Sequence, residues 1–294
     1  MTYSIVGRDP ATGAMGVAVQ SHWFGVGSVV CAASAGLGAI ATQAMPQVQH
    51  KPRALAMLRE GRSAAEIVAS LVEGDPASAH RQFAVVDASG LAVAHTGASC
   101  VAAAGQASGE GYVCQANMMR SADVWPAMAE AYEATIGRGL SAALLAALDA
   151  AELAGGDLRG RQAAAILIVP AAGTDADRLL DVRVEDSPEP LQELHRLVAL
   201  NGAYLLADQG DQLLADGDFR TAADRYVAAY ESAPDTVELK FWAGLGLLTA
   251  GLPDRGLLLL KETIDADASW HEMLRRLSPE IVPSAPEALR LLST

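Results

Sequence analysis

Thr2 is the residue of this chain whose position most clearly suggests chemistry. Met1 is normally removed when the second residue is as small as threonine, so Thr2 would become the first residue of the mature chain. Its hydroxyl would then lie beside its own α-amino group, whose pKa of about 7.7–8 suits a general base near neutral pH. One residue would supply nucleophile and base together. Many ordinary proteins also begin with Met-Thr, so the position alone does not establish this role.

Three other polar residues could support such a nucleophile. Asn117 lies near the end of an expected strand, 112–119, where a rigidly held side-chain amide can stabilise a tetrahedral oxyanion. Its alternative role is to form a turn at the strand end. Asp157 and Arg159 lie in the glycine-rich segment 155–162 and could orient the α-amine or hold a substrate carboxylate through a bidentate arginine contact. The alternative for this pair is a structural ion pair.

Ser21 and His22 close the expected second strand of the chain, and Thr2 opens the first. If the two strands form a hairpin, these ends meet. Both side chains could then support the nucleophile. The alternative for His22 is an exposed histidine at a strand end.

The other residue types that could carry chemistry predict no second site. The three cysteines form neither a CxxC pair nor an even disulfide set, which indicates buried free thiols in a reducing, cytoplasmic setting. The six histidines lack a paired metal spacing, so we expect no metal. The glycines of segment 105–111 do not lie between a strand and a helix, as a dinucleotide loop would, so we expect no cofactor.

Composition limits the class of protein. The 294 residues, 51% of them hydrophobic, allow one large domain or two of ordinary size. A net charge of −14 excludes a nucleic-acid partner, because phosphate backbones are bound by clustered basic side chains. The first hundred residues are balanced in charge, and the acidic surplus lies beyond them. No apolar stretch approaches the roughly 20 residues of a membrane span, so we expect no membrane partner.

The elements that must position these residues alternate between strands and helices. Valine-rich or alternating runs predict strands, and apolar residues at three- and four-residue steps predict helices. We expect strands at 4–8, 14–20, 27–33, 36–43, 82–87, 91–95, 112–119, 163–169 and 180–184, helices at about 51–58, 63–71, 122–135 and 140–154, and a loop at 105–111. Two antiparallel sheets facing one another, each with a helix pair outside, would bury every apolar face. We therefore predict an α+β fold, a four-layer αββα sandwich.

The remainder of the chain, beyond Pro188 and Pro190, is predicted to be helical and contains an internal repeat. Residues of similar type recur 34 positions apart, in the pairs Gly210 and Gly244, Gly217 and Gly251, Ala222 and Gly256, Tyr226 and Leu260, Ala229 and Thr263, and Pro234 and Ala268. A period of 34 with small residues where two helices cross is typical of tetratricopeptide repeats, although the second copy is degenerate. The alternative is a generic pair of helical hairpins.

Several separated motifs of the chain occur together in one known family. They are residues 2–10 (TYSIVGRDP), 16–21 (GVAVQS), 24–27 (FGVG), 41–44 (ATQA), 155–157 (GGD) and 159–162 (RGRQ), with Thr96-Gly97 and Cys100, and Gly111-Tyr112 with Gln115 and Asn117. Over about residues 2–186 the chain resembles the DUF1028 family. The resemblance implies the fold of the N-terminal nucleophile hydrolases and amide-bond hydrolysis, without naming a substrate. It implies catalytic roles for Thr2, Asn117, Asp157 and Arg159, and substrate binding by Ser21, His22, Gln43, Gln115 and Arg161.

Some positions depart from the family pattern. Ala116 stands where glycine is usual, and Ala163 where serine is common. Related proteasome-type enzymes place a lysine beside the nucleophile, but Lys51 is the one lysine of this region and lies outside the expected strands. Its role would pass to Arg159, Arg8 or His22, or be absent.

We therefore expect two domains, 1–187 and 188–294. The first is expected to be an N-terminal nucleophile amidohydrolase that cleaves a small amide or peptide-like bond, with a small carboxylated amide as the first choice of substrate. The alternative is a non-catalytic binding or scaffold protein that uses the acidic helical tail for protein–protein contacts. We also expect a homo-oligomer.

Overall fold

A valine-rich hairpin opens the chain and forms the centre of the larger of two sheets. The computed structural model describes residues 2–174 and 176–293. The hairpin strands are β1 (Thr2–Arg8) and β2 (Met15–Ser21), both almost completely buried. The other strands of this sheet are β7 (Gly105–Gly109), β8 (Tyr112–Asn117), β9 (Ala163–Val169) and β10 (Leu180–Val184). The order is β10-β9-β2-β1-β8-β7, and all neighbours are antiparallel.

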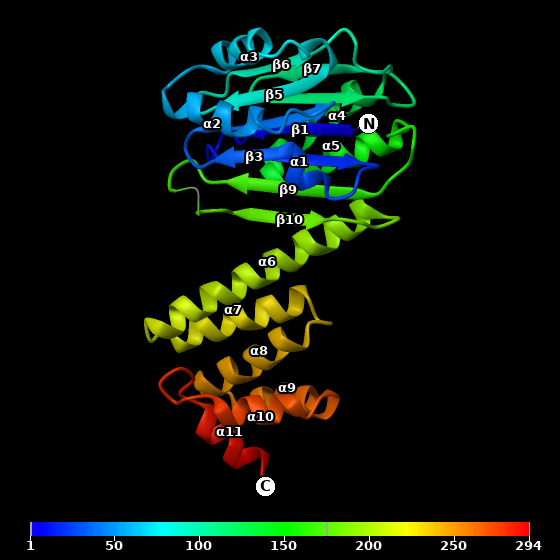
Figure 1. The fold of residues 1–294 in the computed structure, drawn as a ribbon. Helices are drawn as coiled ribbons and strands as arrows, with labels where there is room; N and C mark the ends of the chain where they lie inside the picture. Colours follow the sequence, from blue (N-terminus) through cyan, green and yellow to red (C-terminus); the bar gives the residue numbers. More distant parts are fainter. Residues whose placement is uncertain (1, 175, 294) are drawn as a thin grey trace. The chain divides into compact units, whose positions relative to one another are not determined.

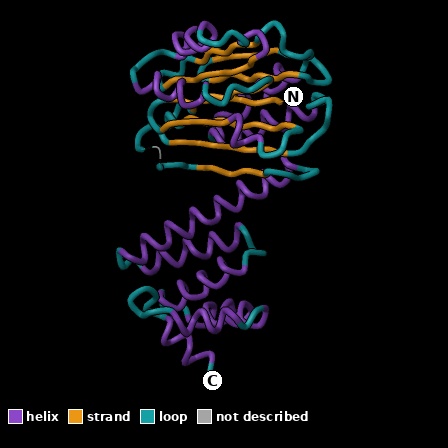
Figure 2. The backbone as a smooth tube through the Cα atoms, viewed as in Figure 1, coloured by secondary structure: helices purple, strands orange, loops and turns teal. Residues whose placement is uncertain are grey.

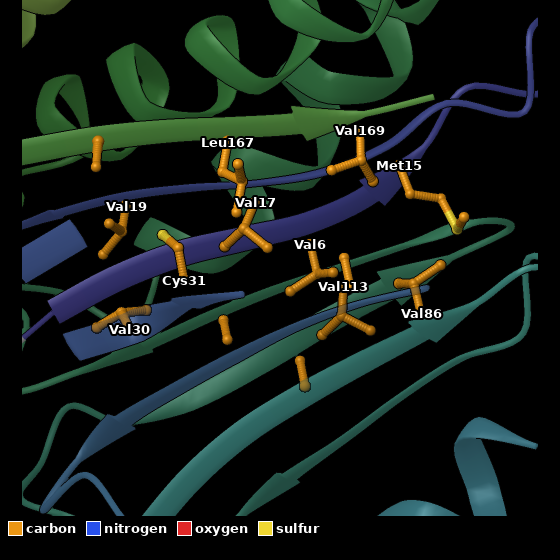
Figure 3. Packing of buried hydrophobic residues seen from close by; sticks show 14 of the residues in the cluster. Val6, Met15, Val17, Val19, Val30, Cys31, Val86, Val113, Leu167 and Val169 are labelled. Atoms are coloured by element: carbon orange, nitrogen blue, oxygen red, sulfur yellow. The ribbon is translucent and has the colours of Figure 1, made fainter. Parts of the chain in front are cut away.

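A second, four-stranded antiparallel sheet faces the first. Its strands are β3 (Cys31–Ser34), β4 (Gly38–Ala44), β5 (Arg81–Asp87) and β6 (Ala92–Thr96), paired in chain order. A core of valine and alanine fills the space between the sheets (Figure 3), with Val6, Val17 and Val113 from one sheet and Ala41, Ala84 and Val86 from the other. Small and β-branched side chains let the two backbones approach closely while leaving few gaps.

Each sheet is covered on its outer face by a helix pair (Figure 1). Helices α2 (His50–Arg59) and α3 (Ala64–Glu73) pack against the four-stranded sheet, where Leu58, Ile67 and Leu71 meet Phe83. Helices α4 (Val124–Thr135) and α5 (Leu140–Leu153) pack against the six-stranded sheet. The capping box predicted from Ser63 and Glu66 is present at the start of α3. The order of layers is therefore helix, sheet, sheet, helix.

Two segments differ from the sequence prediction. The first half of the strand expected at 27–33 is a short helix, α1 (Val26–Val30). It follows Gly25, whose φ of 63° turns the chain, and Gly27 lets the helix lie against β9, since a Cβ there would be 2.5 Å from the Cβ of Ala165. Of the valines that suggested a strand, Val30 is buried by this helix and Val29 is half-buried.

The second difference is the loop expected at 105–111, most of which is the edge strand β7. Its glycines accommodate aromatic rings: a Cβ on Gly105 would collide with Trp125, and a Cβ on Gly109 would lie 2.5 Å from Tyr112. Glycine at these two positions allows an aromatic ring to pack directly on the strand backbone. The same glycines made the sequence of segment 105–111 resemble a loop.

The chain divides into two compact units, residues 1–195 and 196–294, and the division falls within the long helix α6 (Pro190–Ala215). The second unit continues with α7 (Phe219–Ser232), α8 (Val237–Thr249), α9 (Pro253–Ala266), α10 (Ser269–Arg276) and α11 (Ala285–Leu292), all helical in Figure 2. Among the described residues, no helix is long and apolar enough to span a membrane.

The residues paired at a 34-residue spacing occupy corresponding places in this unit. A Cβ on Gly210 would lie 2.7 Å from the ring of Tyr226, and one on Gly244 would lie 2.8 Å from Leu260. Each glycine therefore marks a close crossing of two helices. Turn glycines 217 and 251 both have a positive φ, of 80° and 77°.

Candidate functional site

Thr2 lies where the sequence analysis expected it, at the start of a central strand. It is 6% exposed and lies in register with Asn117 of β8. Its hydroxyl donates to Ser21 Oγ at 3.0 Å, because β1 and β2 pair antiparallel and bring the end of one strand to the start of the other. The structure thus brings together three of the predicted site residues.

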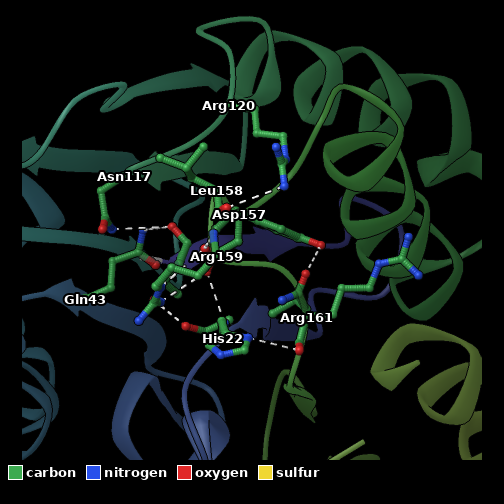
Figure 4. Close-up of polar contacts among 12 residues, drawn as sticks. His22, Gln43, Asn117, Arg120, Asp157, Leu158, Arg159 and Arg161 are labelled. Carbon is green, nitrogen blue, oxygen red and sulfur yellow. Dashed lines mark hydrogen bonds and ion pairs between the residues drawn. The ribbon is translucent and has the colours of Figure 1, made fainter. Parts of the chain in front are cut away.

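The carbonyl of Thr2 is held by two buried amides from different sheets. Gln43 Nε2 donates to it at 3.1 Å from β4, and Asn117 Nδ2 donates at 3.3 Å from β8. Both nitrogens also donate to Oε1 of Gln82, at 2.7 and 3.0 Å (Figure 4 shows Gln43 and Asn117). The two hydrogens of the Asn117 amide are therefore used to fix Thr2 and Gln82, which makes Asn117 a positioning group in this arrangement.

Gln82, at the second position of β5, is a central residue that the sequence analysis missed. It is fully buried, and its Nε2 lies 3.0–3.1 Å from Thr96 Oγ1 and from the carbonyls of Gly105 and Ala116. It thereby links the facing edges of both sheets. A single glutamine in an apolar strand matches no motif, so only its unusual polarity in that strand could have indicated a role.

Gln115 and Ser4 extend the amide cluster away from Thr2. Ser4 Oγ donates to Gln43 Oε1 at 2.7 Å and accepts from Gln115 Nε2 at 3.2 Å. Gln115 is fully buried, and its Oε1 has no hydrogen-bond partner among the described residues. The structure therefore places Gln115 behind Gln43, where it supports that side chain between the sheets.

The backbone is strained on both sides of the cluster. Ala44, which follows Gln43, has a φ of 70°, and Met118, which follows Asn117, has a φ of 57°. Among the described residues these are the two with positive φ that are not glycine. Such conformations cost about 1–3 kcal/mol each and concentrate at functional sites. Each strained residue directly follows one of the two amides, which indicates that the position of these amides is important for the site.

Asp157 and Arg159 form an ion pair in the turn before β9. Arg159 donates from its backbone nitrogen to Oδ1 at 2.8 Å and from Nη2 to Oδ2 at 3.1 Å. Asp157, 2% exposed, also accepts from the backbone nitrogen of His22 at 3.0 Å, which anchors the residue after Ser21 (Figure 4). The two side chains thus form an ion pair, and Asp157 contacts the chain at the end of β2, next to Ser21.

Arg161 is not brought to the Thr2 cluster by its side chain. Its guanidinium pairs with Glu152 of α5 at 2.9 Å and with Glu189, and Figure 4 shows it directed away from Asn117 and Gln43. Its carbonyl lies 3.1 Å from His22 Nδ1. Arg161 therefore orients the His22 ring through its backbone and lies against α5 through its side chain.

A pocket of about 390 Å³ opens beside Thr2, Ser21 and Gln43. Its walls are mostly apolar and come from the segments on either side of the site: Trp23, Val26, Val29, Val30, Ala44, Met45 and Pro46. Among the described lining residues Arg81 is the one cation, and its guanidinium is held by Asp75 at 2.9 Å and by the Met45 carbonyl. The sequence analysis missed Arg81, which no motif marks.

Lys51 and Arg8 are not among the described residues that line this pocket. Lys51 Nζ contacts the carbonyls of Ser28 and Cys31, and burial lowers the pKa of this lysine. Arg8 lies at the far end of β1 from Thr2, paired with Met15. Of the groups proposed to replace a lysine beside Thr2, Arg8 is therefore too distant.

Two of the three cysteines are buried as expected, whereas Cys100 is only half-buried and its thiol donates to the carbonyl of Arg81 at 3.3 Å. Cys31 and Cys114 are buried, and burial raises the pKa of the Cys31 thiol to about 12. A thiol held protonated in this way is a poor nucleophile.

Comparisons with known proteins bear on the first unit. The profile of a family described as "Family of unknown function (DUF1028)" matches residues 2–194. The crystal structure of protein SPO2555 from Silicibacter pomeroyi, also described as DUF1028, is similar with a TM-score of 0.59 and 32% identity, and the match covers 67% of this chain and 87% of that one. Anbu (ancestral beta-subunit) from Yersinia bercovieri matches with a TM-score of 0.31 and 10% identity, over 66% of this chain and 91% of that one. No curated protein matches. With two thirds of its length matched by the family profile, this chain belongs to the DUF1028 family.

Proposed function

We propose that this protein is an N-terminal nucleophile amidohydrolase in which Thr2, exposed by removal of Met1, attacks the carbonyl carbon of a small amide. The observation that carries the proposal is the position of Thr2, which lines a pocket. Its hydroxyl is hydrogen-bonded to Ser21, and its carbonyl accepts hydrogen bonds from two buried amides. Removal of Met1 concerns a residue outside the described part of the chain. The sandwich of layers is of the kind expected for this enzyme class.

In the proposed reaction the α-amine of Thr2 takes the proton of its own hydroxyl as Oγ1 bonds to the substrate carbon. Collapse of the tetrahedral intermediate breaks the carbon–nitrogen bond, and the same proton passes to the leaving amine. A water molecule then attacks the ester carbon and gives a proton to the α-amine. Collapse of this second intermediate breaks the bond between carbon and Oγ1, Oγ1 takes the proton back from the amine, and the acid is released. Thr2 is restored with no other reactant consumed.

The surrounding residues position the nucleophile. Gln43 and Asn117 hold the Thr2 carbonyl from both sheets and so fix the peptide plane next to the reacting atoms. Ser21 selects one rotamer of the hydroxyl through the 3.0 Å contact. Preorganisation of this kind lowers a barrier because the groups need not reorient during the reaction.

The pocket supports a substrate with an apolar side and a carboxylate. The valines of α1, at positions 26, 29 and 30, line one wall, where an acyl or aliphatic group would be desolvated. Arg81 is a cation at the same pocket; its Nε donates to Asp75 and its Nη1 to the Met45 carbonyl, so a substrate carboxylate would accept a charge-assisted hydrogen bond from Nη2. A small carboxylated amide with an aliphatic side chain combines both features.

For the second unit we propose a tetratricopeptide-like arrangement. The corresponding crossings at Gly210 and Gly244, and the turns at Gly217 and Gly251, support it. This assignment does not enter the proposed chemistry.

Hydrolysis of N-acyl amino acids, dipeptides and cyclic amides by the full chain tests the proposal. Thr2→Ala should lower turnover by at least about a thousandfold, because it removes the nucleophile while leaving the amine. Thr2→Ser is the matched control and should retain activity, since it keeps a hydroxyl and a small second residue. Unchanged turnover in Thr2→Ala would show the mechanism to be wrong.

Two further measurements separate this mechanism from a hydroxyl activated by another base. The intact mass of the active protein should correspond to the chain without Met1. The value of kcat/KM should rise with pH through about 7.7–8, because the α-amine must be unprotonated to accept the proton. Full activity in a chain that retains Met1 contradicts the role of the amine.

A further inference from the structure

A cavity of the second unit lies among residues that are not part of the Thr2 site. It is a groove of about 770 Å³ formed by α6, the N-terminal part of α7, α8 and the segment that precedes α11. All its lining residues belong to the second unit. The proposed hydrolysis does not use it.

The groove has apolar and aromatic walls that remain accessible. Trp242 and Leu245 line it from α8. Tyr204 and Phe219 are 37% and 40% exposed, and Ile281 is 65% exposed. Large apolar side chains gathered in one concave surface are typical of a binding surface for another molecule.

The charged residues of the groove all carry the same sign. They are Asp208, Asp211, Glu238 and Glu280, and no lysine, arginine or histidine is among the lining residues described. Two of these carboxylates are oriented by tyrosines: Asp211 accepts from Tyr226 at 2.6 Å and Glu238 from Tyr204 at 2.8 Å. The groove therefore presents fixed anionic acceptors between apolar surfaces.

These carboxylates come from three separate segments of the chain, which favours a ligand with more than one cation. Asp208 and Asp211 lie three residues apart on α6 and share a face, whereas Glu238 opens α8 and Glu280 lies in the segment before α11. The aromatic rings of Tyr204 and Trp242 favour cations at the same place. The apolar walls add a requirement for aliphatic groups between the charges.

We propose that this groove binds a segment of a partner protein in which lysine or arginine side chains alternate with apolar ones. Charge complementarity selects the basic residues, and the aromatic and aliphatic walls receive the apolar residues. A simple polyamine matches the charges but leaves the apolar walls uncovered. The peptide satisfies both.

The test measures binding of a short capped peptide of repeating Lys-Leu-Ala units to the full chain, by calorimetry. The same peptide with glutamate in place of lysine should not bind, and spermine should bind more weakly than the lysine peptide. Affinity for the lysine peptide should fall as salt is raised, because the carboxylates are exposed or half-buried. Absence of saturable binding, or equal binding of spermine, would overturn the proposal.

Matched variants locate the binding to the groove. The double variant Asp208→Asn with Glu238→Gln should bind the lysine peptide about tenfold more weakly, as expected for two exposed charge contacts. Glu231→Gln with Asp265→Asn removes the same charge from exposed positions that do not line the groove and should change the affinity little. Equal losses in both double variants would show that only the net charge attracts the peptide.

A second pair tests the apolar contact. Ile281→Ala removes an exposed side chain of the groove, and Leu258→Ala removes a 58% exposed side chain from α9, outside the lining residues. Neither position is buried, so both variants should fold, which circular dichroism checks. Only Ile281→Ala should weaken binding of the lysine peptide. Equal affinity in the two variants contradicts an apolar contribution from the groove.

Discussion

At the scale of single residues, the site depends on a buried side chain that carries no charge and performs no chemistry. Gln82 accepts hydrogen bonds from Gln43 and Asn117, the two amides that hold the Thr2 carbonyl. Its own amide nitrogen lies within hydrogen-bond distance of the Thr96 hydroxyl and of two backbone carbonyls. A fully buried network of this kind stabilises only when its members are satisfied together, which makes Gln82 the residue most sensitive to replacement.

We predict that Gln82→Leu lowers the free energy of unfolding by about 2–3 kcal/mol or more. The leucine fills the volume but leaves buried donors and acceptors without partners, each costing about 1–3 kcal/mol. Urea unfolding measures the change. Gln192→Leu is the control, because Gln192 is exposed on α6, and its loss should cost less than about 1 kcal/mol. Similar losses in the two variants would contradict the importance of the buried network.

The residue scale also sets the limit of what sequence could predict about the site. Thr2, Ser21, Gln43 and Asn117 were named from motifs, and the structure brings them together. Arg161 was named with them, yet its side chain pairs with Glu152, because neighbouring residues of a turn point in different directions. Gln82 and Arg81 were missed, since their contacts come from strand pairing and no short pattern records them.

At the scale of elements, the short helix α1 connects the pocket to the sheet. Its valines line the pocket, and its glycine lies against β9. We predict that Gly27→Ala lowers the free energy of unfolding by about 1–3 kcal/mol, because the added methyl group overpacks the contact with Ala165 and Arg183. The displaced valines should also raise KM for any substrate that Thr2 cleaves.

Gly137→Ala is the matched control for this change. A Cβ at Gly137 would meet nothing within 4 Å, so this variant should be neutral or slightly more stable. Urea unfolding and steady-state kinetics of both variants check the prediction. If Gly27→Ala is destabilised but its KM is unaltered, the position of α1 does not determine substrate binding in the pocket.

The sequence predicted most elements of the first unit because their burial follows simple periods. Strands 163–169 and 180–184 were predicted at the bounds they have, and the capping box placed the start of α3 correctly. The strand predicted at 27–33 was wrong at its start because valine is common both in strands and in a helix buried on one side. Whether such a short run is helix or strand depends on the sheet it meets.

Helix α2 carries a titratable group into the core beneath the four-stranded sheet. His50 is fully buried against Phe83, with Nε2 3.4 Å from Asp75. Burial lowers the pKa of His50, with smaller contributions in the same direction from Arg53, Arg81 and His95, while Asp75 opposes the shift. The neutral form is therefore the one that the folded state prefers.

We predict that acidification destabilises the protein through His50. A folded-state pKa below the unfolded value of about 6.5 means that the unfolded chain binds more protons. The stabilisation is complete above about pH 6.5 and is lost as pH falls through the folded-state pKa. Asp75, whose pKa is lowered mainly by its hydrogen bond with Arg81, loses its contribution only below about pH 4.

The comparison is between wild type and His50→Gln, by urea unfolding at pH 7.5 and 5.5. Wild type should lose more stability over this interval than the variant, which has no titrating group at this position. The difference between the two pH values is the measurement, so an absolute loss caused by repacking does not affect it. Parallel pH dependence in the two proteins would rule out His50 as the origin.

At the scale of the whole molecule, the described residues form separate cores within the two units. The valine and alanine core and the cluster under α2 and α3 belong to the first unit, and two clusters around Phe241 and Tyr226 belong to the second. None of these clusters draws described residues from both units. The acidic surplus does not follow this division, because it lies in both units, beyond the balanced first hundred residues.

Separate cores predict that a packing defect in one unit is felt mainly there. Gly244→Ala should lower the stability of the second unit by about 1–3 kcal/mol, because the new Cβ would lie 2.8 Å from Leu260 and 3.0 Å from the carbonyl of Gly256. Gly202→Ala is the control in the same unit. A Cβ there meets nothing within 4 Å, and alanine stabilises a helix by up to about 1 kcal/mol over glycine.

Hydrogen exchange read by mass spectrometry distinguishes the two units directly. Gly244→Ala should accelerate exchange in α7, α8 and α9, whose helices pack around Gly244 and Tyr226, and should leave β1 and β5 at their wild-type rates. Gly202→Ala should slow exchange in α6 or leave it unchanged. If Gly244→Ala also accelerates exchange in β1 and β5, the two units unfold as one cooperative body. The proposed hydrolysis in the first unit and the proposed peptide binding in the second unit would then be energetically coupled.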